Sequence, residues 1–398
     1  MNYNFSTSTC RKDTNAEKYT LRNELFGDGD VFPAWVADMD IDTPDFVLDA
    51  VKERLTHPIV GYEEVPPSAF LAQIDWMKRE HGIEYELVDM LYSHSVVASM
   101  NAAIEAYSDV GDKVIVQTPV YPPFFHGVKH LKREVLKNPL KQGEDGKYIF
   151  DIDDLKSKID EKTKLLLLCS PHNPVGRAWR RDELEKILEL CLENNIVVFS
   201  DEIHSDLVYE PYKHIPFASL SQKARDITVT AIGVGKTFNM AGFAMSSIAI
   251  SNEELREKFL HVYKKVHFAE GSVLSHVAFE SAYKNGKEWL EELKIHLMSN
   301  FNMLIKLCDN YPELIKVTPI EATYLAWLDC RGMGLSDKKL REFFAKEAKV
   351  GLNAGLSFGR EGSGFMRLNF AISHVRMLEL IDLLENALKN YQNKRDDG

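Results

Sequence analysis

The feature that most constrains the fold is the alternation of short apolar runs with helix-like segments between about residues 45 and 290. The runs KLLLLC and NNIVVF are nearly continuous in apolar residues, and the segment RRDELEKILELCLENN between them has the spacing of an amphipathic helix. Continuous apolar strands that alternate with helices are typical of a mostly parallel sheet covered on both faces. The sequence therefore predicts an α/β fold.

The pattern changes after residue 286, where long helical segments lead to two strand-like pieces, YLAWLDCR and FMRLNFA, and a last helix. A chain of 398 residues also exceeds what one compact core usually holds. We therefore expect a large domain over residues 46–287 and a small α/β domain formed by residues 1–45 together with 288–398. At the start of the large domain, Asp42 or Thr43 is the expected N-cap of the helix in TPDFVLDAVKERL.

Charge and composition exclude several classes of partner. The net charge is −12, from 48 basic and 60 acidic residues, and there is no long basic run, so a nucleic-acid partner is not expected. The longest apolar runs are too short to cross a bilayer, so no membrane partner is expected. Five scattered cysteines, no Cys-x-x-Cys pair and a polar N-terminus without a signal peptide predict reduced thiols and a cytoplasmic location. No His, Cys and Asp cluster has metal-ligand spacing, so we predict no metal site.

Reactive side chains follow the predicted strands. Asn173 lies in SPHNPVG, Asp201 in SDEIH, Lys236 in GVGK and Arg367 in GFMRLNF. Groups at the carboxyl edge of a parallel sheet converge on one site. A lysine that loses its proton forms an imine with an aldehyde, a buried aspartate holds a pyridine nitrogen protonated, and an arginine clamps a substrate carboxylate. An asparagine can donate a hydrogen bond to a phenolic ring oxygen. These four residues therefore indicate chemistry on an aldehyde-bearing pyridine ring.

Eight segments carry a resemblance to a known family: FGDGDVFPAWVADMDIDTP, VGYEEVP, GDKVIVQTPVYPPF, SPHNPVGRAW, SDEIHSDLVY, KTFNMAGF, TYLAWLDCR and FMRLNFA. In this order, and over nearly the whole chain, they resemble fold-type-I enzymes of the class I/II aminotransferase superfamily, which depend on pyridoxal 5'-phosphate (PLP). More narrowly, the chain resembles the MalY/PatB group of cystathionine β-lyases, which are carbon–sulfur lyases. The resemblance implies a large domain with a mostly parallel central sheet and a smaller α/β domain.

The resemblance assigns a role to each residue around the cofactor. Lys236 matches the Schiff-base lysine, Asp201 the partner of the pyridine nitrogen and Asn173 the donor to the ring oxygen. His204 stands three residues after Asp201, where typical aminotransferases carry a tyrosine and the lyase group has histidine. Tyr121 matches the aromatic residue that stacks on the ring, and we expect Lys236, Tyr121 and Asp201 to act in catalysis.

The resemblance also implies how phosphate and substrate are held. The backbone at Val96 and Val97 matches the phosphate cradle at the start of a helix, where free N–H groups favour an anion. Tyr62 matches a tyrosine that reaches the phosphate from the other subunit, which implies a homodimer with the active site at the subunit interface. Arg367 matches the clamp of the substrate carboxylate. The Asn173–Pro174 bond is expected to be cis.

Blander interpretations of these residues stay open at this point. Most lysines are exposed, so Lys236 without its flanking motif would be a surface charge. His204 alone is more often a hydrogen-bonded structural histidine. Tyr121 between prolines is compatible with a packing role in a turn, and Arg367 with pairing to a structural carboxylate.

The family pattern breaks where it usually contacts the phosphate. Members of the superfamily usually have Ser-x-Ser before the lysine, and many have an arginine eight residues after it. This chain has Gly233 and Gly235 at the two serine positions and Ala244 at the arginine position. Glycine still offers its backbone N–H, and Ser95 or Ser99 are candidate replacements. We therefore expect a cofactor that is bound more weakly or anchored differently.

The expected activity is β-elimination from cystathionine or cysteine, giving a thiol, pyruvate and ammonia. One alternative is an aminotransferase, which needs a keto-acid acceptor. A second is a regulatory binding protein that keeps the fold but has reduced catalysis, which the altered phosphate site makes worth testing. The substrate is expected to be an amino acid in every enzymatic case.

Overall fold

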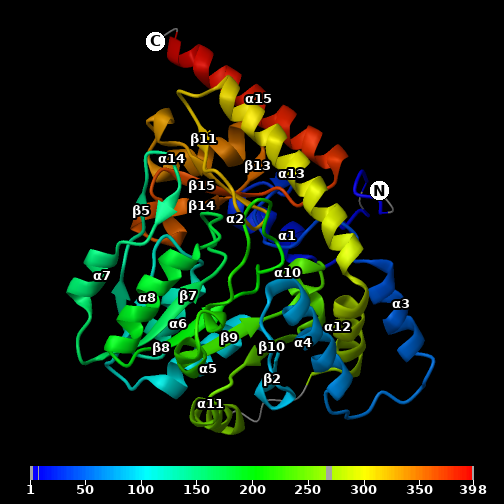
Figure 1. Cartoon of the computed structure of the whole chain (residues 1–398). Helices are drawn as coiled ribbons and strands as arrows, with labels where there is room; N and C mark the ends of the chain where they lie inside the picture. The colour runs from blue at the N-terminus through cyan, green and yellow to red at the C-terminus, as the bar shows by residue number, and fades with distance from the viewer. Residues whose placement is uncertain (1–2, 8, 266–270, 397–398) are drawn as a thin grey trace.

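A computed structural model describes residues 3–7, 9–265 and 271–396. Its centre is a seven-stranded sheet in the order β2-β10-β9-β8-β7-β3-β4 (Figure 1). All neighbouring strands are parallel except at β10, which is antiparallel to both of its neighbours. The predicted mostly parallel sheet is therefore confirmed. The strands are β2 (Met90–Ser93), β3 (Lys113–Val116), β4 (Glu134–Lys137), β7 (Thr163–Cys169), β8 (Val197–Asp201), β9 (Thr228–Ile232) and β10 (Ser246–Ala249).

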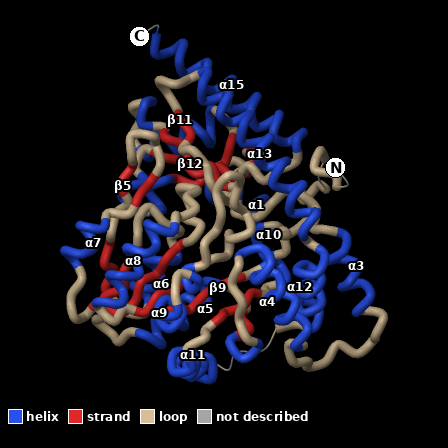
Figure 2. The backbone as a smooth tube through the Cα atoms, viewed as in Figure 1, coloured by secondary structure: helices blue, strands red, loops and turns tan. Residues whose placement is uncertain are grey.

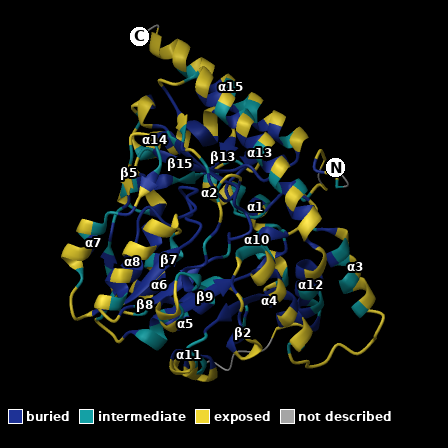
Figure 3. Cartoon of the chain, viewed as in Figure 1, coloured by how far each residue is buried: buried dark blue, intermediate teal, exposed yellow. Residues whose placement is uncertain are grey.

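Alternate residues of the central strands pack on opposite faces of this sheet. In β7, Leu165 and Leu167 belong to a core with one set of helices, whereas Leu166 and Leu168 belong to a core with another set. Because helices cover both faces, the strands are buried, and Figure 3 draws them in dark blue. The continuous apolar sequence of β7 predicts this burial on both faces. The first face carries α5 (Val96–Tyr107), α6 (Pro123–His130) and α11 (Glu253–Lys265), and the second carries α7 (Ile152–Lys158), α8 (Arg181–Glu193) and α9 (Gln222–Ile227).

A smaller sheet forms a second group of strands above the first (Figure 2). Its order is β11-β12-β15-β14, and each pair of neighbours is antiparallel. Two long helices, α13 (Lys287–Asn310) and α15 (His374–Asp396), lie side by side along this part of the molecule (Figure 1). The strands are β11 (Lys316–Val317), β12 (Leu325–Asp329), β14 (Asn353–Ala354) and β15 (Phe365–Asn369).

The N-terminal segment lies against the C-terminal part of the chain. It contains α1 (Glu17–Thr20), α2 (Arg22–Phe26) and β1 (Phe32–Pro33), and β1 pairs in parallel with β13 (Val350–Gly351). The structure thus has a large unit and a smaller unit, while the boundaries at 46–287 stay a prediction. The remaining main elements are α3 (Asp45–Arg54), α4 (Pro67–His81), α10 (Val234–Thr237), α12 (Val273–Asn285), α14 (Asp337–Glu342), β5 (Lys141–Gln142) and β6 (Tyr148–Ile149).

The expected N-cap of α3 can be compared directly with the structure. The N-cap of α3 is Pro44, so the prediction of Asp42 or Thr43 was wrong. Asp42 accepts hydrogen bonds from Thr9, and the Thr43 hydroxyl donates to the carbonyl of Asn239. Both side chains are thus used in tertiary contacts. Among the described helices, none has the length and apolarity needed to cross a membrane.

Candidate active site

The carboxyl ends of β7, β8 and β9 border a cavity of about 210 Å³. The first residues of α5 and two residues of α10 complete its lining. The register of the sheet sets Cys169, Asp201 and Ala231 side by side at this edge. The fold therefore brings together most of the residues that the sequence analysis selected. Those that line the cavity are Val96, Val97, Tyr121, Asn173, Asp201, His204 and Lys236.

Lys236 is held in the cavity by a hydrogen bond to the main chain. Its Nζ donates to the carbonyl oxygen of Ala37 at 2.6 Å. Burial, and after it the positive charge of Arg367, lowers the pKa of the Lys236 amine to about 8, against the opposing effects of Asp38 and Asp201. An amine with this pKa is partly neutral near physiological pH, which a nucleophilic lysine requires.

Asp201 ends β8 and is buried, with little to compensate its charge. The N–H of Ile203 donates to its Oδ1 at 3.1 Å. Burial raises the pKa of the Asp201 carboxyl to about 7, although this hydrogen bond and the charge of Lys236 oppose the rise. A cationic partner would stabilise the ionised form of this buried carboxyl group, because an adjacent positive charge favours a carboxylate over a carboxylic acid.

One ring nitrogen of His204 is buried without a hydrogen-bond partner in the described chain. Its Nδ1 is buried and makes no hydrogen bond within the described part of the chain. Burial lowers the pKa of the imidazole to about 3, so the ring is neutral at physiological pH. The ring packs edge-on against Tyr324 with centroids 5.9 Å apart. Because buried polar atoms are normally satisfied, a ligand atom is the natural partner for this nitrogen.

Tyr121 and Asn173 lie on opposite sides of a tight backbone contact. The Tyr121 N–H donates to the carbonyl of Asn173 at 3.2 Å, and the Asn173–Pro174 bond is cis. Burial raises the pKa of the Tyr121 hydroxyl, although the ring retains 36% of its exposure. Tyr121 is thus neutral, and both residues line the cavity, where the side-chain oxygen of Asn173 accepts a hydrogen bond from Arg367 Nη1.

Arg367 is a buried cation without an acidic partner. Its Nη1 donates to Asn173 Oδ1 at 3.1 Å, and its Nη2 donates to the Trp35 carbonyl at 2.9 Å and to Asn353 Oδ1 at 2.7 Å. Within the described residues it forms no ion pair, and its Nε has no hydrogen-bond partner. Burial lowers the pKa of the guanidinium to about 10. The alternative of a structural carboxylate partner is therefore not borne out in the described chain.

The start of α5 provides the backbone groups expected at the phosphate end. Val96 and Val97 are its first two residues, and the N-cap Ser95 accepts a hydrogen bond from the N–H of Ala98 at 3.2 Å. The remaining N–H groups of a first helical turn have no partner inside the helix and attract anions. Ser95 lines the cavity, as does Ser246, which the sequence analysis did not select.

Ser99 was wrong as a candidate phosphate contact. It is fully buried, and its hydroxyl is hydrogen-bonded to those of Ser93 and Tyr263. Ser99 stands one helical turn after Ser95, on the side of α5 that packs into the protein rather than at its N-terminus. Its hydroxyl therefore serves packing beneath the helix.

The three departures from the family pattern differ in their surroundings. A Cβ at Gly233 would lie 2.9 Å from Ile203 Cδ1 and 2.9 Å from Ser246 Cβ, so a serine there would force these neighbours to shift. A Cβ at Gly235 would meet nothing closer than Ala241 Cα at 3.4 Å. Ala244 adopts a left-handed conformation, with φ of 49°. The neighbours thus crowd a side chain at Gly233 but leave space for one at Gly235.

Tyr62 is not brought to the cavity of its own chain. It lies in the connection between α3 and α4 and is fully exposed, with a relative accessibility of 109%. Ile59 and Val60 beside it are exposed by 67% and 58%. An exposed apolar loop is compatible with the predicted contact to a second subunit, and that role stays a prediction.

The sequence analysis did not select the residues that fix the N-terminal segment next to Lys236. Asn239 Nδ2 donates to the carbonyls of Met39 and Ile41 at 3.0 and 2.6 Å, and the Met39 N–H donates back to Asn239 Oδ1 at 2.9 Å. These bonds fix the segment that carries the Ala37 carbonyl. The signal was present in KTFN and WVADMD, which served only as marks of resemblance.

A buried charge network supports the same segment. Lys18 is fully buried and pairs with Asp38 at 2.8 Å and with Asp40 at 3.5 Å, while Arg11 pairs with both carboxylates at 2.8 Å. Two cations thus balance two anions, which a buried cluster requires. The acidic residues of WVADMD therefore anchor the N-terminal segment behind Ala37.

These groups fit the cofactor that the resemblance implies. A pyridine ring carrying an aldehyde, a hydroxyl and a phosphate has a counterpart for each group here: Asp201 for the ring nitrogen, the free His204 Nδ1 for a polar ring substituent, Lys236 for the aldehyde and the start of α5 for the phosphate. Within the described residues, no group of three or more His, Cys, Asp or Glu side chains is arranged to hold a metal ion. The donor set is thus one for an organic phosphate.

Comparison with known proteins agrees with this geometry. Residues 36–384 match the family model described as aminotransferase class I and II. The chain is 39% identical over 386 residues to cystathionine beta-lyase PatB of Bacillus subtilis, with 97% of this chain and 100% of that protein covered.

Solved structures show the same fold. Cystalysin of Treponema denticola, whose crystal structure contains PLP, superposes with a TM-score of 0.94 at 33% identity and covers 98% of this chain and 100% of that one. The PLP-bound C-S lyase of Staphylococcus hominis superposes with a TM-score of 0.88 at 33% identity, with 98% of each chain covered.

Proposed function

The chain belongs to the class I and II aminotransferase family and is a PLP-dependent enzyme, and on this premise we propose that it is a carbon–sulfur β-lyase. It cleaves the Cβ–S bond of a β-thio amino acid of the cystathionine or cysteine type, releasing a thiol, pyruvate and ammonia. The observation that carries the proposal is a cavity lined by the buried Lys236 and Asp201, together with a buried arginine without an acidic partner, Arg367, which donates a hydrogen bond to Asn173 in the lining of that cavity. The names of the relatives support the lyase reaction over others on this fold.

Lys236 performs the proton transfers at the substrate. PLP, when bound, supplies an aldehyde that captures amines and a ring that accepts the electron pair released at the substrate Cα. In its neutral form Lys236 Nζ is the nucleophile toward that aldehyde, which its lowered pKa permits. With a substrate bound, the free Nζ would take the proton from Cα, and the Ala37 carbonyl would accept a hydrogen bond from the resulting ammonium, as it does from Lys236 in this structure.

Four side chains orient the ring. Asp201 would pair with the protonated ring nitrogen, and the burial of its carboxyl group would strengthen this pairing. Asn173 and His204 would hold the ring oxygen, which would give the buried His204 Nδ1 a hydrogen-bond partner. Tyr121, which lines the cavity and is 36% exposed, would stack on the face of the ring. Val96 and Val97 offer backbone N–H groups to the phosphate.

Arg367 binds the substrate carboxylate. Its guanidinium carries a full positive charge, is buried and lacks an anionic partner in the described chain, which is the arrangement that an incoming carboxylate completes. The carboxylate orients Cα toward Lys236. The C–H bond breaks first, then the Cβ–S bond, and the thiolate leaves with a proton that Lys236 Nζ gives up, with Tyr121 as the relay. Water then completes the conversion to pyruvate and ammonia.

A second subunit completes the site in this proposal. Tyr62 of one chain reaches the phosphate held by its partner, which accounts for the full exposure of Tyr62 in the single chain. The enzyme is accordingly a homodimer. Analytical ultracentrifugation of the holoenzyme tests this: a monomer that is fully active excludes the shared site.

The experiment that tests the function is pyruvate release from L-cystathionine and L-cysteine, with added PLP and without a keto acid. Wild type is compared with Lys236→Ala and with Lys156→Ala, an exposed lysine on α7. We expect catalytic pyruvate from wild type and Lys156→Ala, and none from Lys236→Ala.

Aminotransfer is the second candidate, favoured by the family model that the chain matches. It predicts no pyruvate from either substrate, but amino transfer once a keto acid is supplied. That result would reject the lyase and leave an aminotransferase. A colourless protein that takes up no PLP would instead favour a binding protein without catalysis.

A further inference from the structure

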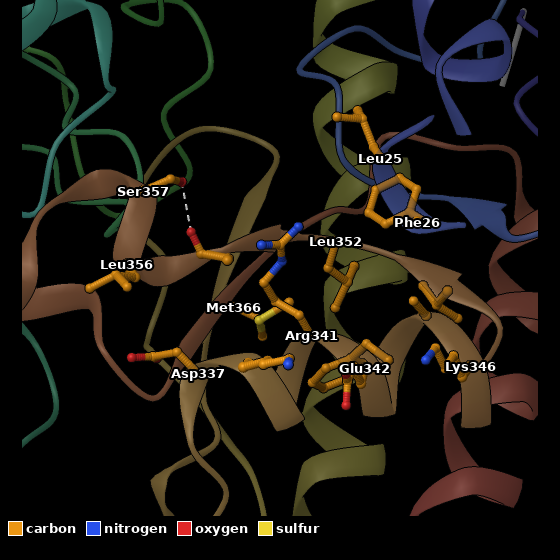
Figure 4. Close-up of a pocket in the computed structure, with 15 residues that line it drawn as sticks. Leu25, Phe26, Asp337, Arg341, Glu342, Lys346, Leu352, Leu356, Ser357 and Met366 are labelled. Atoms are coloured by element: carbon orange, nitrogen blue, oxygen red, sulfur yellow. Dashed lines mark hydrogen bonds between the residues drawn. The ribbon is translucent and has the colours of Figure 1, made fainter. Parts of the chain in front are cut away.

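A second cavity, of about 610 Å³, lies in the smaller unit, between α2, α14, β14 and β15 (Figure 4). Its apolar walls include Phe26, Phe344, Leu352 and Met366. Its volume is in the range of small-molecule sites, which is about 300–1,000 Å³, and it is larger than the active-site cavity. It thus has the size and lining of a site for an organic ligand.

This cavity is separated from the active site by the thickness of one sheet. Successive residues of a strand point to opposite faces. Met366 faces the second cavity, while its neighbour Arg367 faces Asn173 and the active site. In β14, Ala354 faces the second cavity and Asn353 accepts the hydrogen bond of Arg367. The two cavities therefore have separate linings.

Cations dominate the polar part of the second cavity. Lys338, Arg341 and Lys346 line it, and none of the three forms an ion pair or hydrogen bond with any other described residue. Of the acidic residues that line it, Asp337 is occupied, because it accepts hydrogen bonds from Ser363 Oγ and the Gly364 N–H at 2.8 Å each. Glu342 is the other, and in Figure 4 its carboxylate and the Arg341 guanidinium point in opposite directions.

The unpaired cations contrast with the chain as a whole, which has a net charge of −12. Three cations and two carboxylates line this cavity, and because Asp337 already accepts two hydrogen bonds, the lining keeps a net positive charge in an otherwise acidic protein. Arg341 is the best placed of the three, since Figure 4 shows its guanidinium reaching toward the strands near Leu352 and Met366. An arginine presents a planar fork that matches a carboxylate.

We propose that this second cavity binds a small organic monocarboxylate with an apolar body. The carboxylate pairs with Arg341, and the apolar body packs against Phe26, Leu352 and Met366. A ligand of this kind satisfies both parts of the lining at once, because burial of its hydrocarbon provides affinity and the paired charge fixes its orientation.

The test is isothermal titration calorimetry of the PLP-loaded enzyme with phenylbutyrate. Acetate, which carries the same charge without the apolar body, is the matched ligand. The variants are Arg341→Gln and, as a control of equal charge change, Arg360→Gln, an exposed arginine of the same unit that does not line the cavity. Both arginines are exposed, so neither substitution disturbs the core.

We expect one phenylbutyrate per chain and no measurable heat with acetate. Arg341→Gln should weaken binding by roughly tenfold to a hundredfold, the value of a charge-assisted hydrogen-bonded pair, and Arg360→Gln by less than about twofold. Absence of binding to wild type overturns the proposal. So does binding that Arg341→Gln leaves unchanged, since that result places the acid elsewhere, for example at Arg367. Because the readout is binding heat, failure of the proposed lyase activity does not affect it.

Discussion

Lys236 and Tyr324 donate hydrogen bonds to the same acceptor, the carbonyl oxygen of Ala37, at 2.6 and 2.8 Å. Ala37 comes from the N-terminal segment, Lys236 from α10, which follows β9 of the large sheet, and Tyr324 from the smaller unit. Tyr324 is fully buried, and because its hydroxyl donates to the same oxygen, each of the two hydrogen bonds weakens the other. The position and proton affinity of the lysine amine therefore depend on a residue far from it in sequence.

Replacing Tyr324 with phenylalanine should raise the pKa of Lys236. The Ala37 carbonyl then accepts from the ammonium alone and stabilises the charged form by about 0.5–1 kcal/mol, which corresponds to roughly half a pKa unit. The measurement is the pH midpoint of PLP capture by the apoenzyme, followed by absorbance. Tyr209→Phe is the control, because Tyr209 is also buried but donates to the Thr323 carbonyl. An unchanged midpoint in Tyr324→Phe would contradict the shared-acceptor explanation.

Capture of PLP by the apoenzyme should follow the titration of Lys236 near pH 8. Only the neutral amine reacts, so the rate constant should rise about tenfold between pH 7 and pH 9 and level off above that. A lysine of ordinary pKa near 10.5 would give a rise of about a hundredfold over the same interval, without a plateau. Stopped-flow absorbance distinguishes the two profiles, and the second would show that burial does not depress this pKa.

The same pKa has a consequence for stability. A lysine whose pKa is depressed in the folded state contributes its full stability above the unfolded value of 10.5, and that contribution is lost as pH falls through about 8. The apoenzyme therefore carries a cost at neutral pH that reaction with an aldehyde removes. This is one reason to expect PLP to raise the melting temperature.

Asp201→Asn should stabilise the apoenzyme above pH 7. The folded pKa of Asp201 is raised to about 7 from an ordinary value near 3.8, so its contribution is highest below 3.8 and is lost as pH rises through 7. The full cost is on the order of 4 kcal/mol, which asparagine does not incur. Melting temperatures of apo wild type and apo Asp201→Asn should be alike at pH 4.5 and differ at pH 8, with the variant higher.

The PLP-loaded enzymes should show the opposite order. With a ring nitrogen to pair with, the Asp201 carboxylate becomes favourable, so PLP should raise the melting temperature of wild type more than that of Asp201→Asn. Asp206→Asn serves as a control, since Asp206 is buried but already bound by His81, Trp76 and Thr237 and should only lose stability. A variant stabilised equally by PLP would show that Asp201 does not contact the ring nitrogen.

Site residues that follow strands of the sheet could be predicted from the sequence, whereas contacts from the N-terminal segment could not. Asn173, Asp201 and Lys236 could be placed together because each follows a buried strand, and parallel strands end at one edge. The Ala37 carbonyl could not be placed, because a backbone acceptor has no signature in side-chain type and lies 199 residues from Lys236. The N-cap of α3 was wrong for a related reason: Asp42 and Thr43 bond to distant residues, which local propensity does not include.

The altered phosphate site can be tested with a matched pair of substitutions. Gly235→Ser places a hydroxyl on a residue that lines the cavity, and its Cβ has room, since the nearest atom is Ala241 Cα at 3.4 Å. Gly233→Ser forces its Cβ within 2.9 Å of Ile203 and Ser246, which should cost about 1–3 kcal/mol of stability. We therefore expect Gly235→Ser to bind PLP roughly tenfold more tightly, and Gly233→Ser to melt at a lower temperature without tighter binding.

Pyridoxal, which lacks the phosphate, separates anchoring of the phosphate from a general change of the cavity. Dissociation constants of apo wild type and both variants are measured for PLP and for pyridoxal by absorbance titration. The gain in Gly235→Ser should be confined to PLP, because the new hydroxyl acts on the phosphate alone. An equal gain for pyridoxal would place the hydroxyl at the ring. A gain for PLP in Gly233→Ser would mean that Ile203 and Ser246 yield, and that the glycine is not required by packing.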